Sequence, residues 1–404
     1  MRFQEVSALS ICRQHSMKKI FILIISIIVI TESKGQRQDG NDDNITIDVR
    51  KNYPKKELIL QDLFDVEYIA LDSSDEFVCQ GLVLDVGKKF IIVKNSINDG
   101  DIFVFDGKGK GLRKFNRKGQ GSEEYLNISV TDVVLDEDSE EIFIYDRRGI
   151  GVYDLFGKFL RRLTIRDSVT FRALQNFDRE HLIVRYMDYR HDVTSLKSQP
   201  FSIISKKDGS VVNEIQIPIK KQVNEFVELK EERAVFFLNS IFKPLFPFHE
   251  SWILTDMSSD TIYRLLPDYS MIPFISRTPS IHSMNPEIFL FPNILTDRYY
   301  MLQTFKKEFH KEVPGGFPRT KIAYDRLEKK IYEYILYNND YATKKEVDIW
   351  NVLGNPEIIY SEKIEAYELV EANEKGELKG KLKEVVDGLD EDPNPVIMLI
   401  KSKQ

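Results

Sequence analysis

The chain has 404 residues, of which 42% are hydrophobic and 30% charged, and this composition excludes an intrinsically disordered or low-complexity protein. Only two cysteines are present, which excludes both a scaffold built on disulfides and a cysteine-rich zinc module. The 26 Phe and 18 Tyr, together with many Ile and Val, favour β-strands.

The N-terminal region contains one short apolar segment, Ile20–Ile30, which carries no charge. A membrane-spanning helix needs about 20 apolar residues, so this segment is short for a stable anchor. Lysines precede the segment and small residues follow it, at Lys18, Lys19, Ser33 and Gly35. This order predicts a secretory signal peptide over residues 1–35, cleaved after about Gly35, with Met17 as the true start of the protein.

Removal of such a signal makes the chain more acidic than its whole-sequence net charge of −7. An acidic exported protein lacks the basic surface that supplies most of the affinity for nucleic acid, so we expect no nucleic-acid partner. We expect a monomer that resides in the periplasm or outside the cell. The alternative is a protein that stays anchored in the membrane by an uncleaved N-terminal segment.

Internal repeats organise the rest of the chain. Val104–Phe115 and Val152–Leu163 align with each other without a gap, and in each a strand, a tight glycine turn and a second strand follow one another. Looser copies of this hairpin begin at Phe201 and Thr261. Another pair of strands precedes each hairpin, so the repeating unit is four antiparallel strands in about 50 residues, which is the size of a propeller blade.

Counting these units predicts five complete blades and a sixth that the two chain ends build together. We expect the five at residues 81–116, 130–165, 171–217, 235–276 and 288–337. The sixth would combine Phe64–Leu71 and Val396–Lys401 with Glu357–Tyr360 and the region 364–371, which closes the ring and leaves no open edge.

The spacing of apolar residues over Glu374–Leu389 predicts one short amphipathic helix inserted in the sixth blade. Residues 36–47 are expected to form a flexible lead-in. The predicted fold is therefore all-β, a six-bladed β-propeller over residues 48–404 with a helical insertion near its C-terminus.

Several stretches, taken in this order along the chain, resemble the secreted six-bladed β-propellers that are common in Bacteroidota and are related in shape to NHL-repeat propellers. They are Ile45–Asp48, Phe64–Leu71, Gly119–Tyr125, Asp260–Leu265 and Asn394–Leu399. Where that family has Gly-x-Gly-Pro-Gly-Glu-Tyr, this chain has Ser122 in place of Pro and Glu123 in place of Gly. The resemblance implies the fold and export and specifies no activity.

Motifs for catalysis and metal binding are missing from the sequence. No two histidines have the spacing of a metal site, and the six are His15, His181, His191, His249, His282 and His310. The Gly-x-Ser-x-Gly motif of the α/β-hydrolases is absent. The glycines of Gly107–Gly111 precede a strand and not a helix, so they indicate a turn and not a phosphate loop. The acidic run Asp136–Glu141 lacks the glycine of a calcium loop and indicates a solvated turn. We therefore expect no catalytic residue, metal or cofactor.

The strongest candidate for a ligand site is the stretch Arg117–Tyr125, which joins the first two predicted blades. Arg117, Glu124 and Tyr125 are able to hold a polar ligand by charge-assisted hydrogen bonds. The alternative is that Glu124 and Tyr125 only fix the turn between the blades. A second candidate is Phe242–Phe248, either an aromatic patch beside the central channel or part of the core.

Two functions of different classes follow. The first is a binding or interaction module whose ligand is a small molecule, a glycan or a protein. The second is a lyase or a lactone-type hydrolase with a metal near the central channel, which requires acids of several inner strands, such as Asp85, Asp132 and Asp136, to converge with histidines. The scarcity of histidines favours the binding module.

Overall fold

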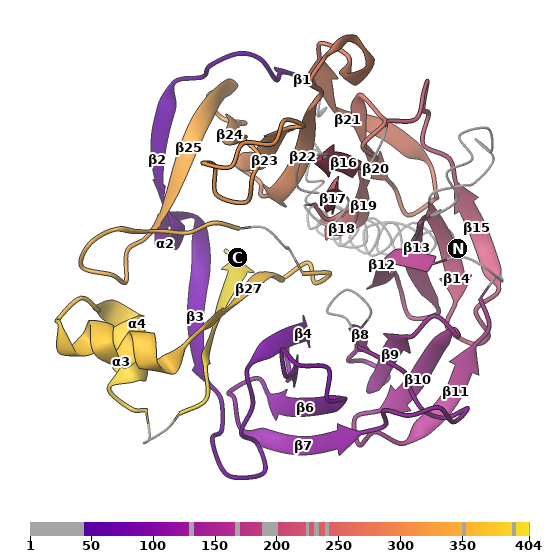
Figure 1. The fold of residues 1–404 in the computed structure, drawn as a ribbon, viewed down its shortest axis with the longest axis vertical. Helices are drawn as coiled ribbons and strands as arrows, with labels where there is room; N and C mark the ends of the chain where they lie inside the picture. The colour runs from indigo at the N-terminus through magenta and orange to yellow at the C-terminus, as the bar shows by residue number, and fades with distance from the viewer. Residues whose placement is uncertain are drawn as a thin grey trace, which may run out of the picture. The chain divides into compact units, whose positions relative to one another are not determined.

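The computed structural model describes residues 44–128, 133–165, 170–187, 201–223, 226–229, 234–238, 242–349, 353–389 and 393–403. Short antiparallel strands dominate this part of the chain, and Figure 1 shows them gathered into sheets arranged as blades around a common centre. The predicted signal peptide lies outside the described residues. None of the helices within these ranges is long and apolar enough to cross a membrane.

The first two blades follow the repeat of the sequence. From the centre outward, blade one is β4 (Leu82–Val86), β5 (Phe90–Lys94), β6 (Asp101–Asp106) and β7 (Gly111–Asn116), and blade two is β8 (Val133–Asp136), β9 (Glu141–Tyr145), β10 (Ile150–Asp154) and β11 (Phe159–Leu163). The repeat extends to the irregularities, because the register of the outer hairpin shifts after Val104 in blade one and after its aligned counterpart, Val152, in blade two.

Blades three to five have the same plan. Blade three is β12 (Thr170–Asn176), β13 (His181–Met187), β14 (Phe201–Ser205) and β15 (Val211–Ile215); blade four is β18 (Leu245–Phe248), β19 (Ser251–Leu254), β20 (Thr261–Leu265) and β21 (Met271–Thr278); blade five is β22 (Ile288–Leu295), β23 (Tyr299–Lys306), β24 (Arg319–Asp325) and β25 (Lys330–Asn338), with β26 (Lys345–Glu346) paired to β25. A short 3-10 helix, Ile281–Ser283, joins blades four and five.

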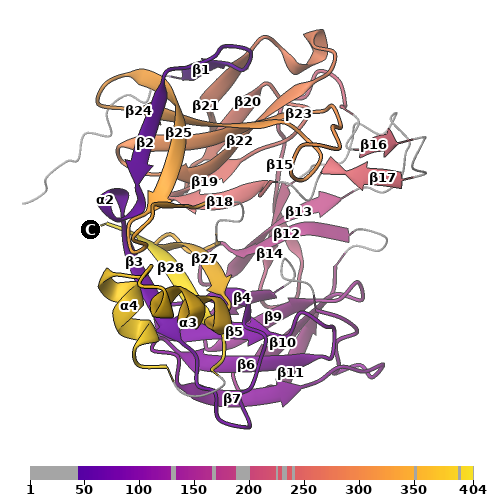
Figure 2. The ribbon, with the colours of Figure 1, turned by 60° about the vertical axis from the view of Figure 1, so that its left-hand side comes forward.

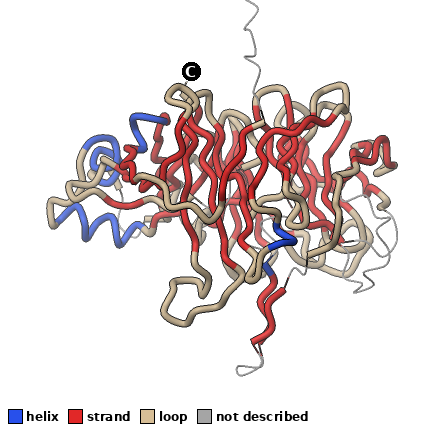
Figure 3. The backbone as a smooth tube through the Cα atoms, turned by 90° about the horizontal axis from the view of Figure 1, so that it is seen from above, coloured by secondary structure: helices blue, strands red, loops and turns tan. Residues whose placement is uncertain are grey.

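A hairpin between blades three and four stands apart from this plan. It consists of β16 (Phe226–Leu229) and β17 (Ala234–Phe237), which pair only with each other in the described part of the chain. Figures 2 and 3 show it projecting away from the blades. Our prediction that blade four begins at residue 235 was therefore wrong, because its innermost strand is β18.

The N-terminal segment reinforces the outer edges of two blades with parallel strands. β1 (Ile45–Asp48) pairs with β21 of blade four, and β2 (Lys55–Ile59) pairs with β25 of blade five. Ile47 is completely buried in this arrangement. The lead-in expected over residues 36–47 consequently ends earlier than predicted, since residues 45–47 belong to a strand.

Blade six closes the ring by joining a strand from the N-terminal part of the described chain to strands from its C-terminal part. β28 (Val396–Ser402) lies between β27 (Ile358–Ile364) and β3 (Phe64–Ala70), and it is antiparallel to both. Val396 is opposite Ala70, so the predicted pairing of the first and last strands of the propeller is confirmed. The short helix α2 (Leu60–Leu63) connects β2 to β3.

The helical insertion in blade six differs from the prediction. It contains two helices, α3 (Ala366–Glu374) and α4 (Gly380–Val386), where one helix over Glu374–Leu389 was expected. The region 364–371, expected to complete the sheet, is mostly α3. Its apolar residues are spaced for a helix as well as for a strand, and the buried Leu369 packs with Leu382 of α4 in one core cluster.

Alternate residues of each strand pack against opposite neighbouring blades. In β28, Val396, Met398 and Ile400 belong to the core shared with blade five, whereas Ile397 and Leu399 pack against blade one. In a propeller, other sheets cover both faces of each sheet, so both sets of alternating side chains are apolar. Each strand therefore appears in the sequence as a short apolar run.

The glycines of the repeated turns fix how each blade docks on the preceding one. Gly109 has φ +88, and a Cβ there would lie 2.0 Å from the carbonyl oxygen of Ala70 in blade six. A Cβ at Gly157 (φ +77) would likewise clash with the side chain of Phe115 in blade one, and a Cβ at Gly209 (φ +83) would clash with the carbonyl oxygen of Thr164. The turn therefore needs glycine twice, for its left-handed backbone and for the close approach of the neighbouring blade.

Candidate functional site

The three residues predicted as a ligand site are brought together, and they bind one another and the loop around them. The backbone N–H of Arg117 donates to Tyr125 Oη (2.9 Å), and this hydroxyl donates to the carbonyl oxygen of Gly100 (2.6 Å). Arg117 Nε donates to the carbonyl oxygen of Gly157 (2.8 Å) in blade two. The carboxylate of Glu124 accepts the N–H of Gly121 at 2.7 Å.

Burial is greatest at Tyr125, which is 1% exposed and contacts Tyr153 edge to face at 5.7 Å between ring centroids. This burial raises the pKa of Tyr125. These contacts match the expected alternative, in which Glu124 and Tyr125 hold the turn between two blades. A ligand role for Arg117, Glu124 and Tyr125 stays a prediction.

The second predicted stretch, Phe242–Phe248, contributes to the core. Phe242, Phe246 and Phe248 are all buried, and the ring of Phe242 stacks on Phe291 of blade five with centroids 4.0 Å apart. The guanidinium of Arg172, in β12 of blade three, lies 4.3 Å from the ring centroid of Phe242, which precedes β18 of blade four.

The centre of the ring holds charged and polar side chains from opposite blades. Asp85 of blade one accepts the N–H groups of Val86 (2.9 Å) and of Leu135 in blade two (2.8 Å). Burial raises the pKa of Asp85 to about 6, and burial likewise lowers the pKa of Lys243, next to blade four, to about 8. Each charge favours the ionised form of the other, so the two form a partly compensated pair across the centre.

Blades three and six also meet at the centre. A Cβ at Gly354, just before β27, would lie 1.3 Å from Oε1 of Gln175 in β12. The side chain of Gln175 therefore lies directly against the backbone of Gly354, and polar groups occupy this part of the centre.

The described histidines do not converge. His181 lies next to Asp178, His249 next to Asp297, and His310 next to two glutamates, all at the turns of different blades. Within the described ranges no three His, Cys, Asp or Glu residues are grouped so that they could hold a metal ion. His15, His191 and the predicted inner-strand acid Asp132 lie outside these ranges.

A pocket of about 520 Å³ opens at the boundary of blades two and three. Four of its seven lining residues are cationic, and the seven are Arg161, Arg179, Glu180, His181, Ser205, Lys206 and Lys207. They come from the outer strand β11 of blade two and from the two turns β12–β13 and β14–β15 of blade three. The loop Arg117–Tyr125 precedes β8 in the chain, whereas Asp136, the last residue of β8, contacts Lys206 of this pocket. The pocket and the loop therefore lie at opposite ends of β8.

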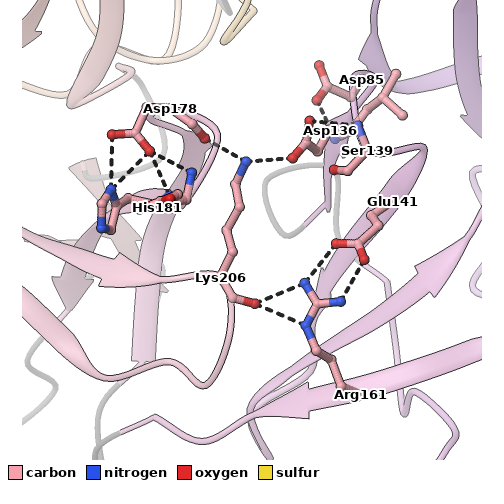
Figure 4. A network of polar contacts seen from close by, with 10 residues as sticks. Asp85, Asp136, Ser139, Glu141, Arg161, Asp178, His181 and Lys206 are labelled. Atoms are coloured by element: carbon pink, nitrogen blue, oxygen red, sulfur yellow. Dashed lines mark hydrogen bonds and ion pairs between the residues drawn. The ribbon is translucent and has the colours of Figure 1, made fainter.

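The floor of the pocket is a fixed network between the two blades, drawn in Figure 4. Lys206 Nζ donates to Asp136 Oδ2 and to the carbonyl oxygen of Asp178, both at 2.6 Å, and the Lys206 and Asp136 side chains are each 6% exposed. Burial acts to raise the pKa of Asp136, but the hydrogen bonds from Lys206 and Ser139 and the positive charge of Lys206 together outweigh it and hold this pKa below its usual value. The acidic run Asp136–Glu141 was predicted to be a solvated turn, and at Asp136 this prediction was wrong.

Arg161 completes the floor. Its guanidinium binds both carboxylate oxygens of Glu141, at 2.6 and 2.7 Å, and donates to the carbonyl oxygen of Lys206. Such a two-point pair fixes the guanidinium plane. The charges of Arg161 and Lys206 are therefore compensated inside the protein.

The rim carries the groups that remain for a ligand. Among the described residues, the side chains of Arg179 and Lys207 form no ion pair, and both residues are exposed. His181 Nδ1 binds the carboxylate of Asp178 at 2.9 Å, which directs the opposite ring nitrogen, Nε2, away from Asp178 (Figure 4). The carboxylate of Glu180 is the one acidic group that lines the pocket.

Sequence reasoning missed this pocket, although it identified the hairpin that begins at Phe201 and contains Lys206 and Lys207. His181 was considered only as an isolated residue. The blade plan held a usable signal, because the first and third turns of one blade lie at the same end of its sheet. Arg179–His181 in the first turn and Lys206-Lys207 in the third are thereby placed side by side.

A second pocket, of about 360 Å³, lies between α3 and the segment before β26. Its lysines and glutamates balance each other, and Lys344 and Lys375 are already paired with Glu57 and Glu371. This pocket offers no excess of either charge.

Comparisons with known proteins agree with the architecture. A candidate exported protein of Bacteroides fragilis shares the fold, with a TM-score of 0.54 and 14% identity over 87% of this chain and 100% of that chain. Two further solved structures are less similar. A Bacteroides caccae protein of unknown function has a TM-score of 0.33 and 9% identity, covering 69% of this chain and 80% of that chain. Virginiamycin B lyase of Staphylococcus aureus has a TM-score of 0.30 and 10% identity, covering 68% of this chain and 94% of that chain.

None of the curated proteins matches the sequence. Residues 36–359 match the model of the family DUF5128, described as a 6-bladed beta-propeller. The match covers most of the chain and agrees with the six blades seen in the structure. The chain therefore belongs to this family of six-bladed β-propellers.

Proposed function

We propose that this propeller is an exported binding module that holds a small anionic ligand in the pocket between blades two and three. The observation that carries the proposal is the composition of this pocket, in which Arg179 and Lys207 rise from a floor whose own charges are already paired. Two cations that form no ion pair with any residue in the described ranges, next to a cavity of about 520 Å³, suit a ligand that brings negative charge.

The floor supports the proposal because it is rigid. Lys206 and Arg161 are each held by two or more hydrogen bonds, and Asp178 accepts the N–H groups of Glu180 and His181, both at 2.8 Å. The turn that carries Arg179 is thus fixed at both ends before a ligand arrives. A prearranged site loses less conformational entropy on binding than a mobile one.

The proposal is tested by isothermal titration of the purified mature protein with sodium phosphate and sodium sulfate at low ionic strength. The double variant Arg179→Ala/Lys207→Ala should bind at least about tenfold more weakly, since each lost charge-assisted hydrogen bond is worth about 1.5–3 kcal/mol. Lys108→Ala/Lys110→Ala removes the same charge at an exposed turn of blade one and should leave binding unchanged. Equal binding by both double variants, or a wild type that binds no small anion, hydroxyl-rich anions included, would contradict the proposal.

Export is part of the proposal and has its own test. The apolar segment Ile20–Ile30 with its flanking lysines supports cleavage near Gly35, so N-terminal sequencing of the mature protein should begin near Gln36. An intact N-terminus would favour the anchored alternative. Metal analysis of the same sample tests the other function, a lyase or hydrolase with a metal near the centre of the ring.

A further inference from the structure

We infer that the ligand of the pocket between blades two and three is a hydroxyl-rich anion, a sugar acid or a sugar phosphate, and not a bare oxyanion. This inference rests on the proposed function. It is drawn from the groups that line the pocket beside its two cations, namely Glu180 and His181.

The first group is the carboxylate of Glu180, which has no hydrogen-bond partner for its side chain among the described residues. A carboxylate only accepts hydrogen bonds, and it repels a bare anion that enters the same pocket. Its presence opposes binding unless the ligand also carries a donor.

The second group is the Nε2 atom of His181. Nδ1 of this ring lies 2.9 and 3.0 Å from the two oxygens of Asp178, and a carboxylate requires a donor, so the proton of the neutral ring is on Nδ1. Nε2 is then an acceptor. It too has no partner among the described residues and can accept a hydrogen bond from a ligand.

The pocket thus offers two cationic donors, Arg179 and Lys207, and two acceptors, Glu180 and His181 Nε2. A bare carboxylate or sulfate satisfies only the cations, and the hydroxyl of hydrogen phosphate can donate to only one of the two acceptors. A ligand ammonium group would satisfy Glu180 but would be repelled by both cations, whereas neutral hydroxyl groups satisfy the acceptors without that cost. A volume of about 520 Å³ has room for a ligand of the size of one or two sugar rings.

The test compares five probes by isothermal titration with the full mature protein: inorganic phosphate, acetate, glucose, glucose 6-phosphate and glucuronate. We expect glucose 6-phosphate to bind at least tenfold more tightly than phosphate, or glucuronate at least tenfold more tightly than acetate, and glucose to bind more weakly than either sugar anion. These two arms distinguish a phosphate source of the charge from a carboxylate source.

The variant Glu180→Gln gives a signature that a merely structural role would not produce. It should weaken binding of the hydroxyl-rich anion about tenfold and strengthen binding of the bare anion, because it removes the best hydroxyl acceptor together with the repelling charge. Glu250→Gln makes the same charge change at an exposed turn of blade four and should alter neither.

The outcomes separate the two proposals. If phosphate binds, and is lost in Arg179→Ala/Lys207→Ala, but the sugar anions bind no more tightly than bare anions, the inference is overturned and the proposed function stands. A Glu180→Gln variant that weakens both classes of ligand equally also overturns the inference. If none of the charged probes binds, the proposed function itself fails and the inference fails with it.

Discussion

Closure of the ring by β28 gives the most direct test of the fold. The strand lies between β27 and β3, so deletion of residues 396–404 would leave an open edge on both. It would also uncover the facing surfaces of blades five and one, because alternate side chains of β28 pack against each. No other described segment of blade six can replace these contacts.

The magnitude follows from the burial of the strand. Its first five residues are apolar and 0–2% exposed: Val396, Ile397, Met398, Leu399 and Ile400. At about 1.5–3 kcal/mol for each buried side chain, their loss removes about 8–15 kcal/mol. That range is an upper estimate, because the unfolded chain already buries some surface. It still equals the whole stability of a typical domain, about 5–15 kcal/mol, so the truncated protein should not fold.

The assay combines this deletion with single substitutions that keep the chain foldable. Ile397→Ala, on the blade-one face, and Met398→Ala, on the blade-five face, should each lower the free energy of unfolding in urea by about 2–5 kcal/mol. Lys401→Ala is the matched control in the same strand, because its ion pair with Glu67 is exposed and should contribute less than about 1 kcal/mol. A soluble, cooperatively folding protein without residues 396–404, or a cost of Ile397→Ala no greater than that of Lys401→Ala, would refute the closure.

Four further predictions concern single sites. Gly109→Ala places a side chain at a left-handed position and against the backbone of blade six, so it should lower the free energy of unfolding in urea by about 3 kcal/mol or more. Gly376→Ala has φ +69 but open space around it and should lower this free energy by only about 1 kcal/mol. Equal losses in the two variants would argue against docking through the turn. Burial raises the pKa of Asp85 above its unfolded value, so protonation of Asp85 stabilises the folded state. The free energy of unfolding of the wild type should therefore rise relative to that of Asp85→Asn by up to about 3 kcal/mol as the pH falls from 7 to 4. A difference between the two proteins that does not change with pH would contradict this. Lys206→Met leaves the buried carboxylate of Asp136 without its cation and should lower the free energy of unfolding by about 3–5 kcal/mol. Most of this loss should be recovered when Asp136→Leu is added, and no recovery in the double variant would speak against the buried pair. Glu124→Ala should lower the free energy of unfolding by about 1 kcal/mol in the absence of any ligand, and unchanged thermal unfolding would restore a ligand role for its loop.

The internal repeat was sufficient to predict the blades, because each blade is assembled from strands that are close in sequence. The aspartates before the turns show why. Asp106 accepts the N–H groups of Lys108 and Lys110, and Asp154 accepts those of Phe156 and Lys158, so each hairpin is fixed by contacts within its own turn. Closure was also predictable, because two good strands at the chain ends had no other sheet to join.

The sequence did not predict the parts that depend on distant segments. β1 and β2 join blades four and five, which come much later in the chain, and nothing local distinguishes such parallel edge strands from a polar lead-in. The region 364–371 forms a helix because it packs on α4 outside the sheet, where a strand would leave its backbone groups without partners.

The pocket between blades two and three depends on tertiary structure beyond the plan of a single blade. The sequence shows Arg161, Arg179 and Lys207 as separate charges of a kind found on any surface. Only the docking of blade three on blade two, through the buried pair of Lys206 and Asp136, brings them around one cavity. Charge in a sequence is local, whereas a binding site is a convergence of groups in space, and the register between blades determines which groups converge.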